Sequence, residues 1–175
     1  MTEKSSVTAR ELALDMLLEI LEKGGFCHIV ERQALSKYQY LPKKERALAT
    51  RLTEGVIERL FSIDYAINQV SKTKTEKMKP VIRNILRIGV YQLLYMDRIP
   101  DSAACNEAVK LAAKRRFSGL KGFVNGVLRS VARNRDTLVF PDEETRLSMP
   151  SWLLDMWKQD LGEEPAAAVA EALLK

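Results

Sequence analysis

The residues with the clearest chemical potential are basic side chains concentrated between positions 108 and 135. That stretch holds no acidic residue and eight basic ones, namely Lys110, Lys114, Arg115, Arg116, Lys121, Arg129, Arg133 and Arg135. Such a cluster concentrates anions and gains affinity by releasing counterions from phosphates. We interpret it as a nucleic-acid-binding surface. The alternative is a solvated face whose counter-charges come from distant segments.

Two weaker basic groups and two aromatic residues accompany this cluster. Lys4 and Arg10 lie before and within the first expected helical turn. Six basic residues fall between positions 72 and 87, where a solubilising loop is an equally good interpretation. Phe117 and Phe123 flank a short turn, and an exposed ring there could stack on an unpaired base. For Phe123, the residues alone favour packing in the core.

The sequence offers no arrangement that we would assign to catalysis. Cys27 precedes His28, but neighbouring side chains on a helix do not face each other. A reactive thiol needs a base or a lowered pKa beside it, so we expect an inert Cys27. With Cys105, the chain has two cysteines and one histidine. These residues form at best an incomplete set of zinc ligands.

Three glycines, Gly119, Gly122 and Gly126, fall close together near the basic cluster. No strand is expected before them, and their spacing matches neither common phosphate-loop pattern. We therefore interpret them as positions of close helix packing.

The elements that position these residues are helices, because apolar residues recur with helical periodicity along the chain. The pattern predicts helices over residues 9–21, 28–38, 44–61, 63–70, 80–96, 103–115, 120–133, 151–161 and 166–174. Thr8 and Glu11 have capping-box spacing, and Gly24 and Gly25 are expected to end the first helix. The helix that begins at Pro80 is so apolar that we expect it at the centre of the core.

Charge divides the chain into two expected units. Residues 141–175 hold three basic and eight acidic residues, whereas residues 1–140 carry a net charge of +10. We therefore expect a basic domain over 1–140, followed by an acidic helical linker over 141–175. No apolar stretch is long enough to cross a membrane, and the simplest location is the cytoplasm with reduced thiols.

Two motifs resemble the NusB family. One is residues 97–112, Asp-Arg-Ile-Pro-Asp-Ser-Ala-Ala-Cys-Asn-Glu-Ala-Val-Lys-Leu-Ala, and the other is residues 123–129, Phe-Val-Asn-Gly-Val-Leu-Arg. The likeness extends over roughly residues 5–140. It implies an all-α fold of two packed helical bundles with an RNA-binding role. It also implies RNA contacts from Lys4, Arg10, Lys121 and Phe123.

The continuation of the chain resembles a second group of proteins. Residues 149–157, Met-Pro-Ser-Trp-Leu-Leu-Asp-Met-Trp, are similar to the segment after the NusB-like domain in the RsmB family of 16S rRNA cytosine-5 methyltransferases. This resemblance implies a further catalytic domain that binds S-adenosylmethionine and carries a Pro-Cys pair. Neither Cys27 nor Cys105 follows a proline, so no cofactor is expected in this fragment. The helix that ends at Lys175 without a cap looks cut from a longer chain.

Three hypotheses remain open from the sequence. In the leading one, this domain positions 16S rRNA for the catalytic domain, through Lys4, Arg10, Lys114, Arg115, Arg116, Lys121, Phe123 and Arg129. In the second, the chain is a free-standing antitermination factor that binds a regulatory RNA and a ribosomal protein. In the third, the domain is an intramolecular scaffold whose basic face docks on an acidic surface of the rest of the parent chain, such as its catalytic domain, and never touches RNA.

Overall fold

The computed structural model describes residues 7–138, and those residues form helices joined by short connections. The elements in chain order are α1 (Ala9–Leu17), the π-helical turn η1 (Leu18–Glu22), α2 (Cys27–Lys37), α3 (Lys43–Glu58), α4 (Leu60–Val70), the 3-10 turn η2 (Thr75–Lys77), α5 (Pro80–Tyr95), α6 (Asp101–Lys114), the 3-10 turn η3 (Ser118–Leu120) and α7 (Lys121–Asn134). No strand occurs between residues 7 and 138. The all-α prediction is therefore confirmed. The helices expected at 151–161 and 166–174 lie outside the described residues, and the division at 140 stays a prediction.

The central element is α5, as the sequence predicts. Pro80 occupies its first turn, where the missing N–H costs nothing. An unbroken run of its residues from Asn84 to Leu93 is buried. It packs against α1, α3, α4, α6 and α7. Because α5 is surrounded in this way, it is the common support for every other helix except α2.

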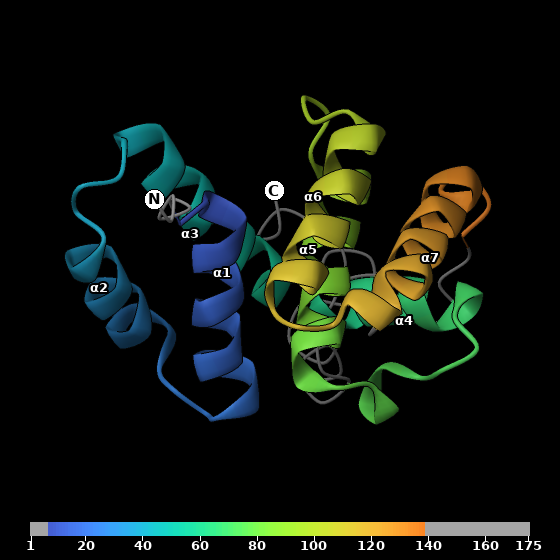
Figure 1. Ribbon diagram of the computed structural model, residues 1–175, viewed down its shortest axis with the longest axis horizontal. Helices are drawn as coiled ribbons and strands as arrows, with labels where there is room; N and C mark the ends of the chain where they lie inside the picture. Colours follow the sequence, from blue (N-terminus) through green and yellow to red (C-terminus); the bar gives the residue numbers. More distant parts are fainter. Residues whose placement is uncertain (1–6, 139–175) are drawn as a thin grey trace, which may run out of the picture.

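Two hydrophobic clusters hold the helices together. The larger one joins α3, α4, α5, α6, α7 and one side of α1. The smaller one contains Ala9, Leu12, Met16, Leu41 and Ala49, with partly buried side chains of α2 packed against it. Figure 1 shows the corresponding arrangement, with α1, α2 and α3 toward one end of the long axis, α5 and α6 near the middle, and α4 and α7 toward the other end. The expectation of two packed bundles is confirmed.

Helix boundaries differ from the predicted ones where α3 meets α4. We expected one helix to run to position 61 and Ser62 to cap the next. Instead α3 ends at Glu58 and α4 begins at Leu60, with Ser62 buried inside it. Arg59 breaks the helix at φ −108° and ψ 19°, and its guanidinium lies over the Tyr95 ring at 4.7 Å. This long-range contact is invisible to local periodicity.

The first helix ends in a π-helical turn instead of continuing as an α-helix. Thr8 caps it by accepting from the Glu11 N–H at 3.1 Å, and Gly24 follows it at φ +77°. Both were predicted, but residues 18–22 form a π-helical turn. The Glu22 carboxylate at its end accepts from Arg83 and from Asn84 Nδ2, and Arg87 binds Asp64 at 2.8 Å. This polar network joins η1 to α4 and α5.

No described helix is long and apolar enough to span a bilayer.

Candidate nucleic-acid interface

Helices α6 and α7 carry the basic cluster, and their apolar faces are buried as the sequence predicts. Ala112, Val124, Leu128 and Val131 are fully buried, and Val127 is nearly so. Val109 and Phe123 are half-buried and pack on the same core. Burial of this stripe turns the lysines and arginines toward solvent. The two helices therefore form the expected rigid support for basic side chains.

The turn between the two helices depends on Arg116. Its φ of 70° is the single positive value at a non-glycine residue between positions 7 and 138. This conformation lets the Phe117 N–H donate to the Ala112 carbonyl at 2.8 Å, which ends α6 as a left-handed residue usually does. Side chains other than glycine rarely adopt it, at a cost of about 1 kcal/mol. The Arg116 side chain is consequently held at an exposed corner before α7.

Carboxylates on α1 neutralise part of the basic cluster. Lys114 Nζ lies 2.7 Å from the Glu11 carboxylate, and Arg115 Nη2 lies 2.7 Å from Asp15 Oδ1 and 3.6 Å from Glu11 Oε1. The Glu11 side chain, which the capping-box spacing directed back to its own helix start, thus binds two cations on α6. Distant counter-charges were the alternative that the sequence left open, and they are present at these two positions.

Two further cations of the cluster also have acidic partners. Lys110 Nζ lies 3.6 Å from Glu107 Oε1, three residues earlier on α6, in an exposed pair of little energetic weight. Arg135 pairs with Asp101 at the start of α6 and donates to the Leu93 carbonyl at 3.2 Å. The cluster of eight is therefore divided, with four of its members in ion pairs.

The remaining four cations form the unpaired basic group, which we define as Arg116, Lys121, Arg129 and Arg133. All four are exposed. Arg129 Nε donates to Asn125 Oδ1 at 3.2 Å, and Arg133 Nη2 donates to Ser130 Oγ at 3.2 Å. These partners are neutral, so the charge is retained. Within residues 7–138, no carboxylate forms an ion pair with any of them.

The other predicted contact residues are placed differently. Lys4 lies outside the described residues. Arg10 is partly buried between α1 and α5, and its Nε donates to Gln92 Oε1 at 2.9 Å. Burial lowers the pKa of its guanidinium, and the charges of Glu107 and Glu45 act in the opposite direction. Phe123 packs on the core, so its ring is only partly available for stacking. The role of each of these residues in RNA binding stays a prediction.

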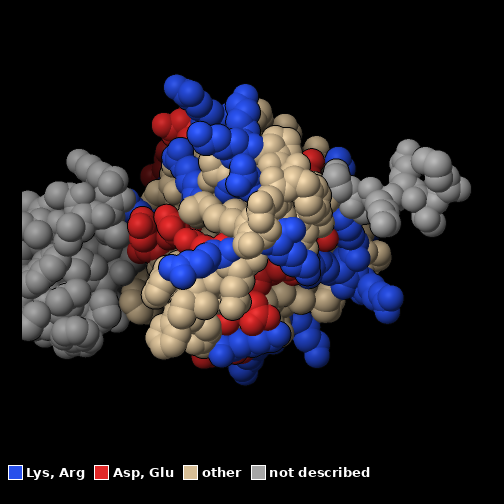
Figure 2. Space-filling model, turned by 90° about the vertical axis from the view of Figure 1, so that its left-hand side faces the viewer, with Lys and Arg blue, Asp and Glu red and all other residues tan. Residues whose placement is uncertain are grey.

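The space-filling view shows how charge is distributed on the side of the molecule that carries α2 and α3. Lysines and arginines gather in separate groups there, with acidic side chains between them (Figure 2).

The acidic residues Glu11 and Asp15, which neutralise Lys114 and Arg115, lie one helical turn apart on α1. Their spacing places both carboxylates on the face of α1 that meets α6, a signal that the pattern of basic residues alone does not reveal.

The close-packing interpretation of the three glycines near the cluster is wrong. A Cβ atom at Gly119, Gly122 or Gly126 would meet nothing within 4 Å. The close approaches occur at Gly25, before α2, and at two glycines inside helices. A Cβ at Gly55 would overlap the Tyr91 ring, and one at Gly89 would lie 2.7 Å from Leu128 Cδ2. These positions allow α3 and α7, respectively, to approach α5.

Both thiols have the environment of unreactive cysteines, which for Cys27 agrees with the expectation from the sequence. Burial, together with the charge of Glu31, raises the pKa of Cys27 to about 11. Burial also raises the pKa of the Cys105 thiol. Thiolate is the reactive form, so both side chains are poor nucleophiles near neutral pH. The described part of the chain contains no group of three His, Cys, Asp or Glu side chains that could hold a metal ion.

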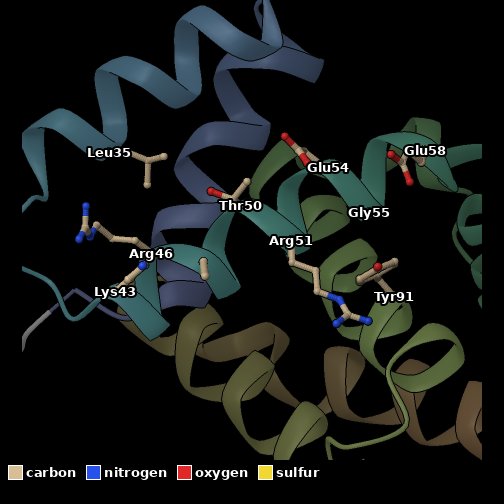
Figure 3. Close-up of a pocket in the computed structure, with 10 residues that line it drawn as sticks. Leu35, Lys43, Arg46, Thr50, Arg51, Glu54, Gly55, Glu58 and Tyr91 are labelled. Carbon is tan, nitrogen blue, oxygen red and sulfur yellow. The ribbon is translucent and has the colours of Figure 1, made fainter. Parts of the chain in front are cut away.

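A groove of about 540 Å³ lies between α2 and α3 and reaches Tyr91 of α5. Figure 3 shows Lys43 and Arg46 near one end and Glu54 and Glu58 toward the other, while Arg51 extends toward Tyr91. Ligand pockets are usually apolar with few polar groups, whereas this groove has charges of both signs along its length.

A comparison with known families matches residues 7–133 to the NusB family. The chain belongs to the NusB family. This assignment covers every described helix except the last residue of α7. The NusB-family domain is also similar to solved structures. With NusB from T. maritima it shares 29% identity at a TM-score of 0.61, over 71% of this chain and 88% of that one. With a complex of the antitermination factors NusB and NusE with dsRNA it shares 22% identity at a TM-score of 0.66, over 71% of this chain and 93% of that one.

The NusB-family domain matches the N-terminal part of RsmB proteins. The probable ribosomal RNA small subunit methyltransferase B of Bacillus subtilis (strain 168) is 32% identical in an alignment of 173 residues, which covers 95% of this chain and 38% of that protein. The ribosomal RNA small subunit methyltransferase B of Thermus thermophilus is 35% identical over 156 residues, or 89% of this chain and 36% of that protein. The chain thus spans less than two fifths of the length of these relatives.

Proposed function

We propose that this chain is the RNA-binding N-terminal part of an S-adenosylmethionine-dependent 16S rRNA cytosine-5 methyltransferase. In this proposal the domain positions rRNA, and the catalytic domain and its cofactor site belong to another part of the parent protein. The cytoplasm, where ribosomes are assembled, is the matching location.

One observation carries the proposal. The likeness to the B. subtilis methyltransferase covers 95% of this chain, whereas the NusB-family region ends at residue 133. The match therefore continues into the acidic segment over 141–175. Free-standing NusB structures cover only 71% to 77% of this chain. The extra similarity favours a methyltransferase parent over a separate antitermination factor.

The geometry of the interface supports RNA as the ligand. Arg116, Lys121, Arg129 and Arg133 are exposed, and none of them is ion-paired to a carboxylate of residues 7–138. Cations of this kind bind phosphate oxygens and release counterions, so affinity falls as salt rises. The solved NusB–NusE complex contains dsRNA on the same fold, which agrees with the proposal.

The decisive measurement is RNA binding by the 175-residue chain at several salt concentrations. We expect it to bind fragments of 16S rRNA with a steep dependence of log Kd on log salt. Replacing Arg116, Lys121 and Arg129 together by alanine should lower the slope by about 0.7 to 0.9 for each phosphate that the variant no longer neutralises. Replacing Lys110, whose charge already has an acidic neighbour, is the control and should change the slope less.

Two results would overturn the proposal. Unchanged RNA affinity in the triple variant would favour the intramolecular scaffold. Tight S-adenosylmethionine binding by this chain alone, measured by calorimetry, would contradict the assignment of the cofactor to another domain. The antitermination alternative is favoured by the likeness to free-standing NusB. It predicts stronger binding to a short regulatory RNA than to any 16S rRNA fragment, and competition between the two RNAs tests it.

A further inference from the structure

A second basic surface lies at the connection between α2 and α3, far from α7. Residues 32–44 contain Arg32, Lys37, Lys43 and Lys44 and no acidic residue. We define the α2–α3 corner as Lys37, Tyr40, Lys43, Lys44 and Arg46. The sequence motifs alone do not select these residues. In Figure 1 the connection lies at one end of the long axis, with α7 at the opposite end.

The lysines of the α2–α3 corner form no ion pairs with carboxylates of residues 7–138. Lys37, Lys43 and Lys44 are exposed, and none has a carboxylate partner within residues 7–138. The nearest carboxylate in sequence, Glu45, is directed elsewhere because it accepts from the Ala9 N–H at 3.0 Å. The Nε atom of Arg46 has no acceptor among the described residues. The corner therefore presents net positive charge.

An aromatic side chain is exposed beside these cations. Tyr40 has 71% of its surface accessible, as much as any large hydrophobic residue of the described part. Its ring centroid lies 5.9 Å from that of Tyr38, which packs on the smaller core cluster. Lys37 Nζ lies 5.4 Å from the centre of the Tyr38 ring. Tyr40 is thus placed next to an anchored ring and within four residues of three lysines, Lys37, Lys43 and Lys44.

We propose that the α2–α3 corner is a second RNA contact, where an unpaired base stacks on Tyr40 and flanking phosphates bind Lys43 and Lys44. This inference rests on the proposed function, because it assigns RNA a second contact on the same domain. Proteins that hold single-stranded RNA combine cations along the backbone with aromatic rings under the bases. The corner has both components at adjacent positions.

The groove beside the corner sets a limit to the contact. Lys43 and Arg46 line the end nearest the corner, and Glu54 and Glu58 line the other end (Figure 3). Carboxylates repel phosphates, so the RNA backbone would contact the basic end and leave the groove before Glu54. An RNA that contacts both this corner and α7 must extend along the long axis of the domain. The substrate would then have at least one unpaired nucleotide at the corner.

The test uses the 175-residue chain and two labelled RNAs of equal length, one single-stranded and one duplex. We expect Tyr40→Ala to weaken single-stranded RNA binding by about fivefold to a hundredfold, the range for removal of one stacked base. Duplex affinity and the salt slope should change much less. Tyr40→Phe keeps the ring and should bind almost as the wild type does.

The charge arm of the test compares two double variants with the same change in net charge. Lys43→Ala with Lys44→Ala should reduce the salt slope for single-stranded RNA by about 1.4, at about 0.7 for each phosphate. Lys72→Ala with Lys74→Ala, in the exposed connection after α4, is the matched control and should reduce it less. Thermal melting by circular dichroism verifies that the variants remain folded.

The outcomes separate this inference from the function on which it rests. Suppose that the wild type binds RNA and that Tyr40→Ala leaves this binding unchanged, or that the two lysine double variants lose equal affinity. Either result would overturn the RNA contact at the α2–α3 corner and leave the proposed function in place. A third outcome is that the Lys43 and Lys44 substitutions weaken RNA binding only in a chain that lacks residues 141–175. The corner would then be a docking site for that acidic segment instead. Failure of the wild type to bind either RNA would overturn the proposed function itself.

Discussion

At the scale of single residues, the pairing of Glu11 and Asp15 with Lys114 and Arg115 decides how the basic cluster is interpreted. A cation that already has a carboxylate at 2.7 Å gains less from phosphate than one that has none, because the existing pair must be broken. In the proposed RNA interface, we therefore expect Arg116, Lys121, Arg129 and Arg133 to contribute more than the ion-paired members of the cluster.

The thiol of Cys27 provides a prediction that is independent of RNA. Burial and the nearby charge of Glu31 raise its pKa from 9.0 to about 11. The thiolate fraction at neutral pH is consequently about 100-fold below that of an ordinary cysteine, because each pKa unit is a factor of ten. We expect alkylation of Cys27 by iodoacetamide to be slow at pH 8 and to accelerate until pH 11.

A substitution tests the cause of that shift. Glu31→Gln removes the charge and weakens the contact between Cys27 Sγ and Glu31 Oε1, which lie 3.4 Å apart. The alkylation rate of Cys27 at pH 8 should rise, measured by mass spectrometry on the Cys105→Ala background. If Cys27 of the wild type were alkylated as fast as a small free thiol, its reactivity would not be suppressed and this prediction would be wrong.

At the scale of helices, some glycines lie where two helices pack closely and others lie on the exposed surface. Gly89 lies on buried α5, and Leu128 of α7 occupies the space where a Cβ would be. Gly126 lies on the exposed side of α7 with nothing nearby. Both are inside helices, so the same substitution has opposite consequences at the two sites.

We predict that Gly89→Ala lowers the free energy of unfolding by about 1 to 3 kcal/mol, because it overpacks the contact between α5 and α7. Gly126→Ala should raise it by about 0.5 to 1 kcal/mol, because alanine loses less backbone entropy in a helix. Urea unfolding followed by circular dichroism measures both changes. Equal effects of the two substitutions would contradict this difference in packing.

At the scale of the whole molecule, stability is unevenly distributed. No residue of α2 is fully buried, and the apolar side chains that pack it onto the smaller cluster are only partly buried. By contrast, α5 is buried along most of its length. Segments with few buried apolar contacts open without global unfolding.

Hydrogen exchange should therefore divide the domain. We expect backbone amides of α2 to exchange through local opening, much faster than those of α5, which should exchange only on global unfolding. Residue-resolved exchange measured by NMR at neutral pH gives both rates. Protection of α2 as strong as that of α5 would refute this division. RNA that binds at the α2–α3 corner should slow the exchange of α2.

The sequence by itself determined the helical class, the central place of the helix after Pro80 and the outward direction of the basic side chains on α6 and α7. Each of these follows from apolar periodicity within one element, because burial of an apolar stripe fixes which face of a helix remains exposed. The motifs over 97–112 and 123–129 likewise carried the family assignment, which the match over 7–133 confirms.

Only the tertiary structure decided which cations are free and which glycines are packed. Glu11 and Lys114 are 103 residues apart in sequence, and Gly89 is 39 residues from Leu128. No local pattern encodes such partners, because they meet only after α1, α5, α6 and α7 have packed together. The charge of a surface is set by that packing, whereas the direction of each side chain is already set by its own helix.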